Sequence, residues 1–286
     1  MLLIFEKQIT YKTVIKTMKL KKYAIVFISP ILVACTEIID ISTNVAPAQL
    51  VVEANIALNE NAQVVLTKTA AIYETADFEK VQNAIVRITD NDGVTELLTE
   101  VSDGVYKSLN LKGVAGKTYS LNINSGNQTI SSACKIPSLV PIDSFTVINS
   151  FYPGGPQPVG NQKAPFYEIK LKYSDPANEQ NFYRLVVYYN EKVQARNSIF
   201  DDRFTNGKLM ESTAIIFNDT AKTGDKIRVE LQCIDKQVHN YFASMGSAGG
   251  PPGSSSSPAN PYTNLTGAIL GYFSAHTIER KEWVLD

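Results

Sequence analysis

Short β-type runs separated by turn residues constrain the fold of this chain more than any other feature. Residues 84–89 alternate apolar and polar side chains and then meet Asp90-Asn91-Asp92-Gly93, a strong hairpin signal. Residues 116–123 alternate in the same way before the turn at Ser125-Gly126-Asn127. About seven such runs at roughly ten-residue spacing are typical of an antiparallel sandwich. We therefore predict an immunoglobulin-like or transthyretin-like β-sandwich over residues 49–137.

A second β-rich domain is predicted over residues 138–286, after a stretch stiffened by Pro137 and Pro141. One helix is expected at 235–245, because Val238, Tyr241, Phe242 and Met245 share one face at helical spacing. The Gly-, Ser- and Pro-rich residues 246–258 indicate a loop. The strands expected in this domain are 143–149, 166–173, 182–189, 212–217, 226–234 and a closing strand at 267–275. The predicted fold class is thus mainly all-β, with one short helix.

The N-terminal residues have the pattern of a bacterial lipoprotein export signal. Lys19, Lys21 and Lys22 precede an apolar run over residues 23–33, which ends at Leu32-Val33-Ala34-Cys35. Cleavage before Cys35 would leave a cysteine that carries a diacylglycerol. The alternatives are a transmembrane helix and an ordinary buried cysteine, but Pro30 interrupts the apolar run, which is also short for a bilayer. We therefore predict a signal peptide over 1–34, with Met18 as an alternative start, and a lipidated tether over 35–48.

The charge balance argues against a nucleic-acid partner. Six of the 27 basic and one of the 28 acidic side chains lie in residues 1–34. Residues 35–286 therefore carry 21 basic and 27 acidic side chains, a net charge of −6. Nucleic-acid binding needs a basic face, whereas an acidic domain is normal on a lipid anchor.

The cysteines leave two alternatives open. With Cys35 assigned to the lipid, Cys134 and Cys233 remain in an export compartment where disulfides persist. They either pair with each other or stay as two buried thiols, and nothing in the sequence brings them together.

No catalytic or metal-binding residue is predicted, and no cofactor. His239 and His276 are the only histidines, and neither has a second His or Cys at the spacing of a metal ligand. Asp90-Asn91-Asp92-Gly93 resembles the start of a calcium loop, but the twelfth position is Val101 rather than an acid. We interpret it as a hairpin turn. A surface hydrolase using Asp201, Asp202 and His276 is the enzymatic alternative.

Aromatic residues concentrate in the second predicted domain and supply its candidate binding residues. Of 27 aromatic side chains, 19 lie in 142–286 and four in 36–141. Rings with polar tips are favoured at ligand sites and interfaces, although those on strands more often fill a core. The adjacent acids Asp201 and Asp202 could bind a cation or a polyol, or stay solvated. The candidate ligand- or partner-binding residues are Phe151, Tyr152, Asp201, Asp202, Phe204 and Tyr262.

Several runs together resemble a family of outer-membrane lipoproteins of unknown function, commonly encoded beside TonB-dependent transporters. Their order and spacing carry the resemblance, which covers nearly all of residues 35–286. The runs are LVVEA (50–54), NAIVRITD (83–90), DGVY (103–106), GKTYSL (116–121), NFYR (181–184), GDKI (224–227) and NLTG (264–267). Individually, each run is only a weak β-protein signal. The family supplies no catalytic residues to carry over.

The resemblance implies an outer-membrane, surface-exposed lipoprotein that is a non-catalytic accessory of a TonB-dependent nutrient uptake system. Its expected partners are the membrane through the Cys35 lipid, a TonB-dependent transporter, and a glycan, peptide or other small nutrient. A stand-alone adhesin or structural surface protein is the alternative.

Overall fold

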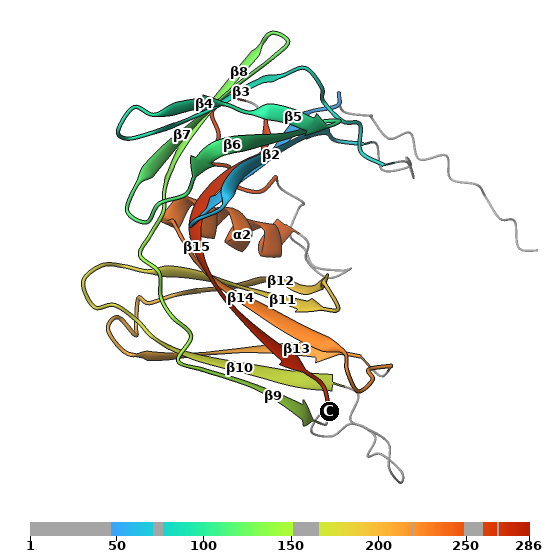
Figure 1. The fold of residues 1–286 in the computed structure, drawn as a ribbon, viewed down its shortest axis with the longest axis vertical. Helices are drawn as coiled ribbons and strands as arrows, with labels where there is room; N and C mark the ends of the chain where they lie inside the picture. The colour runs from blue at the N-terminus through green and yellow to red at the C-terminus, as the bar shows by residue number, and fades with distance from the viewer. Residues whose placement is uncertain (1–46, 71–76, 151–165, 219, 249–259, 268) are drawn as a thin grey trace, which may run out of the picture. The chain divides into compact units, whose positions relative to one another are not determined.

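A computed structural model describes residues 47–286, except 71–76, 151–165, 219, 249–259 and 268. The described residues form fifteen strands and one helix (Figure 1). The first eight strands are β1 (Leu50–Ala57), β2 (Asn61–Lys68), β3 (Ile85–Asp90), β4 (Thr95–Leu97), β5 (Thr99–Ser102), β6 (Val105–Lys112), β7 (Thr118–Ser125) and β8 (Gln128–Lys135). The remaining elements are β9 (Ser144–Ser150), β10 (Phe166–Ser174), β11 (Phe182–Tyr189), β12 (Lys192–Asp201), β13 (Leu209–Phe217), β14 (Lys226–Ile234), α2 (Lys236–Ala248) and β15 (Leu270–Val284). This confirms the predicted all-β fold with one short helix.

Three sheets organise the described strands. The largest has eight strands in the order β12-β11-β14-β15-β1-β2-β6-β5, and so combines strands from both predicted β regions. A four-stranded sheet has the order β4-β3-β7-β8, and a three-stranded sheet has the order β13-β10-β9. The boundary near residues 137–138 stays a prediction.

Each of the smaller sheets shares a hydrophobic core with part of the eight-stranded sheet. In the first core, Val52, Ala54 and Ile56 of β1 meet Ile88 of β3 and Leu121 of β7. The three β1 residues are spaced by two and therefore lie on one face of the strand. Buried and more exposed side chains alternate along most of β1 for this reason.

The second core lies between the three-stranded sheet and the β11–β14 part of the eight-stranded sheet. Ile169 and Leu171 of β10 join Leu185 of β11 and Val229 and Leu231 of β14. All five side chains are fully buried. Many of the aromatic residues that enrich this half also lie in this core, including Tyr173 and Tyr183, whose rings pack 4.9 Å apart.

Strand β15 connects the two parts of the eight-stranded sheet. Its first half pairs in parallel with β1, and its second half pairs antiparallel with β14. The closing strand expected at 267–275 was therefore too short. The first half of β15 pairs with β1 of the N-terminal region and not with a strand of the second predicted domain. Gly271 has φ +106°, and a Cβ there would stand 1.9 Å from the carbonyl oxygen of Val52. Only glycine allows β15 to approach β1 so closely.

Two hairpins show how turns position the strands. At the β3–β4 turn, the Asp90 carboxylate accepts hydrogen bonds from the amides of Asp92 and Val94 and pairs with Lys117 at 2.6 Å. This is the predicted hairpin, with its aspartate oxygens engaged by the turn. The β11–β12 turn consists of Asn190 and Glu191, both with positive φ, as a type I′ hairpin requires. The sequence analysis missed β12, which this turn folds back onto β11.

Candidate ligand-binding pocket

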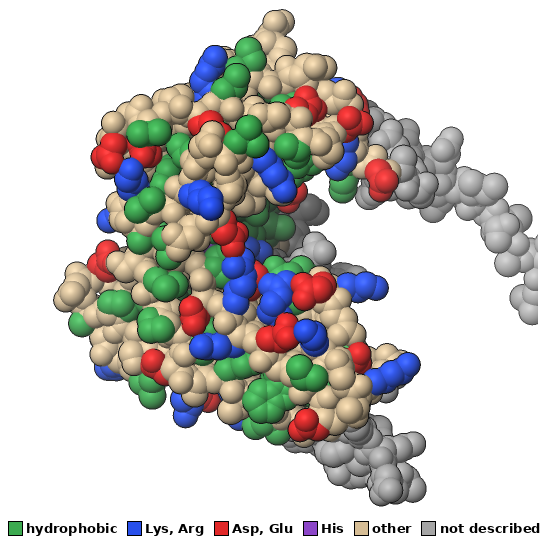
Figure 2. All heavy atoms as spheres, viewed as in Figure 1, with side chains coloured by type: hydrophobic (Ala, Val, Ile, Leu, Met, Phe, Trp, Pro, Cys, Tyr) green, Lys and Arg blue, Asp and Glu red, His purple; other side chains and the backbone are tan. Residues whose placement is uncertain are grey.

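A polar cavity of about 240 Å³ lies on one face of the eight-stranded sheet, over β11, β14, β15 and β1. We call it the polar pocket. Figure 2 shows basic and acidic side chains beside one another on the surface over β14 and β15. The residues used below are Asn55, Arg184, Glu230, Tyr272, His276 and Arg280, all of which line the pocket.

The alternation of the strands explains why this face is polar while the opposite face is apolar. On β14, Glu230 and Gln232 line the pocket, whereas their neighbours Val229 and Leu231 lie in the second core. On β15, His276 lines the pocket, whereas Ala275 lies in the first core. Because successive side chains of a strand point to opposite faces, one set of strands supplies both a core and a binding surface.

Glu230 is the centre of a series of ion pairs in which acidic and basic side chains alternate. Its carboxylate accepts a hydrogen bond from Arg280 Nε at 2.9 Å and another from Arg228, and the Tyr188 hydroxyl lies 3.3 Å away. Burial raises the pKa of the Glu230 carboxyl, but the Arg280 hydrogen bond and the charges of both arginines outweigh burial and hold it below its usual value. Glu230 is therefore ionised at neutral pH.

Each of the two arginines that pair with Glu230 also pairs with a second carboxylate. Arg280 also pairs with Glu60 at 2.7 Å, and Arg228 pairs with Glu191 at 2.8 Å. We call Glu60, Arg280, Glu230, Arg228 and Glu191 the charge network. Each arginine in it has two carboxylate partners, so the positive charges are compensated within the protein.

His276 contributes a neutral imidazole to the pocket. Its Nδ1 lies 2.9 Å from the Ser274 hydroxyl, and only 6% of the residue is exposed. Burial, with the positive charge of Arg184 as the next cause, lowers the pKa of the His276 imidazole to about 4. A neutral ring can both donate and accept hydrogen bonds. Within the described chain, its Nε2 has no hydrogen-bond partner.

An aromatic wall borders the pocket where α2 packs against the sheet. The Arg184 guanidinium lies 3.9 Å from the centre of the Phe242 ring and donates to the Gln232 side chain at 3.1 Å. The Tyr272 ring packs against Tyr241 and Phe242 of the helix.

Asp235 caps the N-terminus of helix α2. The Asp235 carboxylate accepts hydrogen bonds from the amides of Gln237 and Val238. The helix agrees with the predicted one at 235–245, and Val238, Tyr241 and Phe242 are buried as its spacing predicts. Met245, predicted on the same face, is 37% exposed near the helix end.

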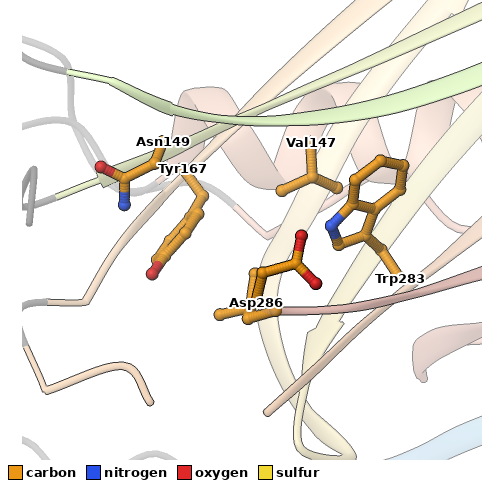
Figure 3. Close-up of a pocket in the computed structure, with 6 residues that line it drawn as sticks. Val147, Asn149, Tyr167, Trp283 and Asp286 are labelled. Atoms are coloured by element: carbon orange, nitrogen blue, oxygen red, sulfur yellow. The ribbon is translucent and has the colours of Figure 1, made fainter. Parts of the chain in front are cut away.

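A second cavity, of about 310 Å³, has a different character and is called the Trp283 pocket. It is lined by Val147, Asn149, Tyr167, Trp283, Leu285 and Asp286. Figure 3 shows Asp286 between Tyr167 and Trp283. The indole of Trp283 also meets Phe145 edge-on, with the ring centres 6.0 Å apart.

The predicted binding residues are not brought together in either pocket. Phe151 and Tyr152 lie outside the described residues, in the connection between β9 and β10. Phe204 is 87% exposed in the turn after β12, and Tyr262 is also exposed, before β15.

The acidic pair has local structural partners. Asp201 pairs with Arg203 at 2.8 Å. Asp202, for which a solvated state was one of the alternatives, is instead 1% exposed, and its carboxylate accepts a hydrogen bond from the Asn181 amide at 2.9 Å. In the described chain, neither aspartate has a hydrogen bond or an ion pair with His276.

Cys134 and Cys233 are two free, buried thiols, the second of the alternatives left open by the sequence. Cys134 lies in the first core and accepts a hydrogen bond from the Ala275 amide at 3.2 Å. Cys233 lies in the second core. Burial raises the pKa of both thiols.

The other histidine, His239, lies on α2 with its ring 5.1 Å from that of Phe182. Burial lowers the pKa of its imidazole, and its Nδ1 is buried with no hydrogen-bond partner. Within the described residues, no cluster of three His, Cys, Asp or Glu side chains is arranged to hold a metal ion.

Sequence reasoning missed the polar pocket, although the sequence contains a signal for it. Glu230-Leu231-Gln232 and Ser274-Ala275-His276 alternate polar and apolar residues inside strands. That alternation indicates two different environments on the two faces of each strand. It does not indicate that β14 and β15 lie side by side with their polar faces together.

The match to a known family covers most of the chain. Residues 36–282 match the family described as "Domain of unknown function (DUF4249)". The chain belongs to this family. Its description assigns no activity to the polar pocket or to the Trp283 pocket. The search of curated proteins gives no match. No helix among the described residues has the length and apolar character needed to cross a membrane.

Proposed function

We propose that the chain is an outer-membrane, surface-exposed lipoprotein that captures a ligand as the non-catalytic accessory of a TonB-dependent nutrient uptake system. The polar pocket is the observation that carries the capture role. Most of its side chains come from four neighbouring strands, and ion pairs orient Glu60, Glu230 and Arg280 before any ligand arrives. Such preorganisation lowers the ordering cost of binding.

Anchoring at Cys35 supports the same role through the physics of tethering. The basic stretch, the apolar run and Leu32-Val33-Ala34-Cys35 form the export pattern described above. A lipid anchor on the same membrane as a transporter raises the effective concentration of one near the other. A modest affinity between them would then be sufficient.

Affinity purification of the tagged lipoprotein from gently solubilised native outer membranes, followed by mass spectrometry, tests this proposal. We expect a TonB-dependent barrel to be recovered in stoichiometric amount. The Cys35→Ser variant should leave the membrane fraction, and the barrel should be lost from its eluate. Recovery of the wild-type lipoprotein alone would instead favour the stand-alone adhesin. Retention of the Cys35→Ser variant in the membrane would contradict lipid anchoring.

A further inference from the structure

We propose that the polar pocket binds a small, uncharged, polyhydroxylated molecule, such as a free monosaccharide or the terminal ring of a glycan. This inference rests on the proposed capture role and names its class of ligand. Three observations support it: the basic and acidic side chains of the pocket balance each other, several polar groups lack hydrogen-bond partners among the described residues, and the cavity is small.

The charges argue for an uncharged ligand. Among the lining residues, Arg184 and Arg280 are balanced by Glu60 and Glu230. Arg280 is already bound to both of these carboxylates. A charged ligand would lose its hydration while finding little net charge to attract it. A neutral ligand loses less hydration and can still use the spare lone pairs of the carboxylates.

The hydrogen-bonding groups match hydroxyls rather than hydrocarbon. Within the described chain, the side chains of Asn55 and Tyr272 and the Nε2 of His276 all lack hydrogen-bond partners. An amide, a phenol and a neutral imidazole each offer both a donor and an acceptor. A sugar hydroxyl also donates and accepts, so these three groups can satisfy several adjacent hydroxyls.

The volume of the polar pocket and its aromatic wall favour a small ring as the ligand. A cavity of about 240 Å³ falls below the roughly 300 Å³ at which pockets for drug-sized ligands begin. The ring of Tyr272 is held in place by Tyr241 and Phe242. A rigid aromatic edge beside polar groups suits a compact ring whose faces carry C–H bonds and whose rim carries hydroxyls.

Calorimetric titration of the detergent-solubilised full-length lipoprotein tests the ligand class with matched pairs of probes. Glucose, other neutral hexoses, pentoses and alditols are compared with glucuronate and glucosamine, which carry one negative or one positive charge on the ring of glucose. We expect at least one neutral probe to bind at least tenfold more tightly than its charged counterparts. Glu60→Gln removes one partner of Arg280, so this variant should gain affinity for glucuronate.

Two tyrosine variants test the location of the site with the same chemical change. Tyr272→Phe removes a hydroxyl from the polar pocket, and Tyr167→Phe removes one from the Trp283 pocket. We expect the first to weaken binding of the neutral probe about tenfold, the equivalent of one lost hydrogen bond of about 1.4 kcal/mol. The second should leave binding unchanged, and both should retain the wild-type melting temperature.

The remaining outcomes separate the ligand class from the capture role. Tighter binding of a charged probe, weakened by Tyr272→Phe, would overturn the uncharged class while leaving capture intact. Binding weakened by Tyr167→Phe alone would overturn the assignment to the polar pocket. If no probe of any class binds, both the ligand class and the capture role of this pocket fail. Recovery of the transporter by affinity purification would then remain as separate support for an accessory role.

Discussion

The polar pocket and the Trp283 pocket are built from the same strand, β15, in different ways. His276 and Arg280 of β15 line the polar pocket, beside neighbours that fix their positions by ion pairs and hydrogen bonds. Trp283, near the end of β15, lines a more apolar cavity with Val147 and Leu285. The comparison shows that one strand can present polar groups held by ion pairs along its middle and an aromatic side chain in a more apolar cavity near its end.

The largest expected effect comes from removing the centre of the charge network. Glu230→Ala leaves Arg228 and Arg280 without their shared partner, in a site where the Glu230 side chain is only 7% exposed. Breaking a buried pair costs about 3–5 kcal/mol. Because Arg280 is half-exposed, we expect a loss near the lower limit, about 3 kcal/mol in the free energy of unfolding measured with urea. A loss below about 1 kcal/mol would mean that the network behaves like surface ion pairs and does not stiffen the pocket.

The next effect is the pH dependence of the folding stability that comes from His276 in the polar pocket. The folded protein holds His276 neutral with a pKa of about 4, whereas the unfolded chain takes up a proton near pH 6.5. The contribution of His276 to stability should therefore fall as the pH drops from 6.5 towards 4, by between about 2 and 3 kcal/mol at pH 4.5. His276→Asn should flatten this part of the stability–pH profile relative to wild type. Equal slopes for the two proteins would contradict the buried, neutral state of His276.

A smaller effect is expected when the Trp283 pocket is opened. Trp283 is 36% exposed, so Trp283→Ala should cost about 1–2 kcal/mol, less than the 3–5 kcal/mol typical of a buried tryptophan. Urea unfolding measures this change, and the variant should keep the wild-type slope between pH 6.5 and 4. It should also bind the neutral probe as wild type does. A loss comparable to that of Glu230→Ala would show that the two pockets contribute equally to stability.

Much of the strand content was predictable because strand periodicity is local. The strands at 182–189 and 226–234 coincide with β11 and β14. The strand β12 was missed, because its hairpin depends on Asn190 and Glu191 adopting positive φ without glycine. The second half of β15 was missed because Glu279-Arg280-Lys281 appears too charged for a strand until β14 is placed beside it.

The polar pocket was not predicted from the sequence, although much of the fold was. Aromatic and acidic residues near turns were expected to bind a ligand, and that stays a prediction: Asp202 accepts a hydrogen bond from the Asn181 amide, and Phe204 is exposed to solvent. The polar pocket instead uses side chains from the interior of strands. The sequence shows that these side chains are polar, but it does not show which neighbouring strand completes a pocket with them.

The sequence by itself determined the all-β character, the hairpin at Asp90 and the amphipathic helix, because alternation, turn chemistry and helical spacing involve residues close together in the chain. Only the tertiary structure decided that β15 joins β1 to β14 and that Glu60 meets Arg280. It also decided that Cys134 and Cys233 lie in different cores. These relations depend on which distant segments become neighbours, and the free energy that selects among such arrangements comes from burial and pairing across the whole fold.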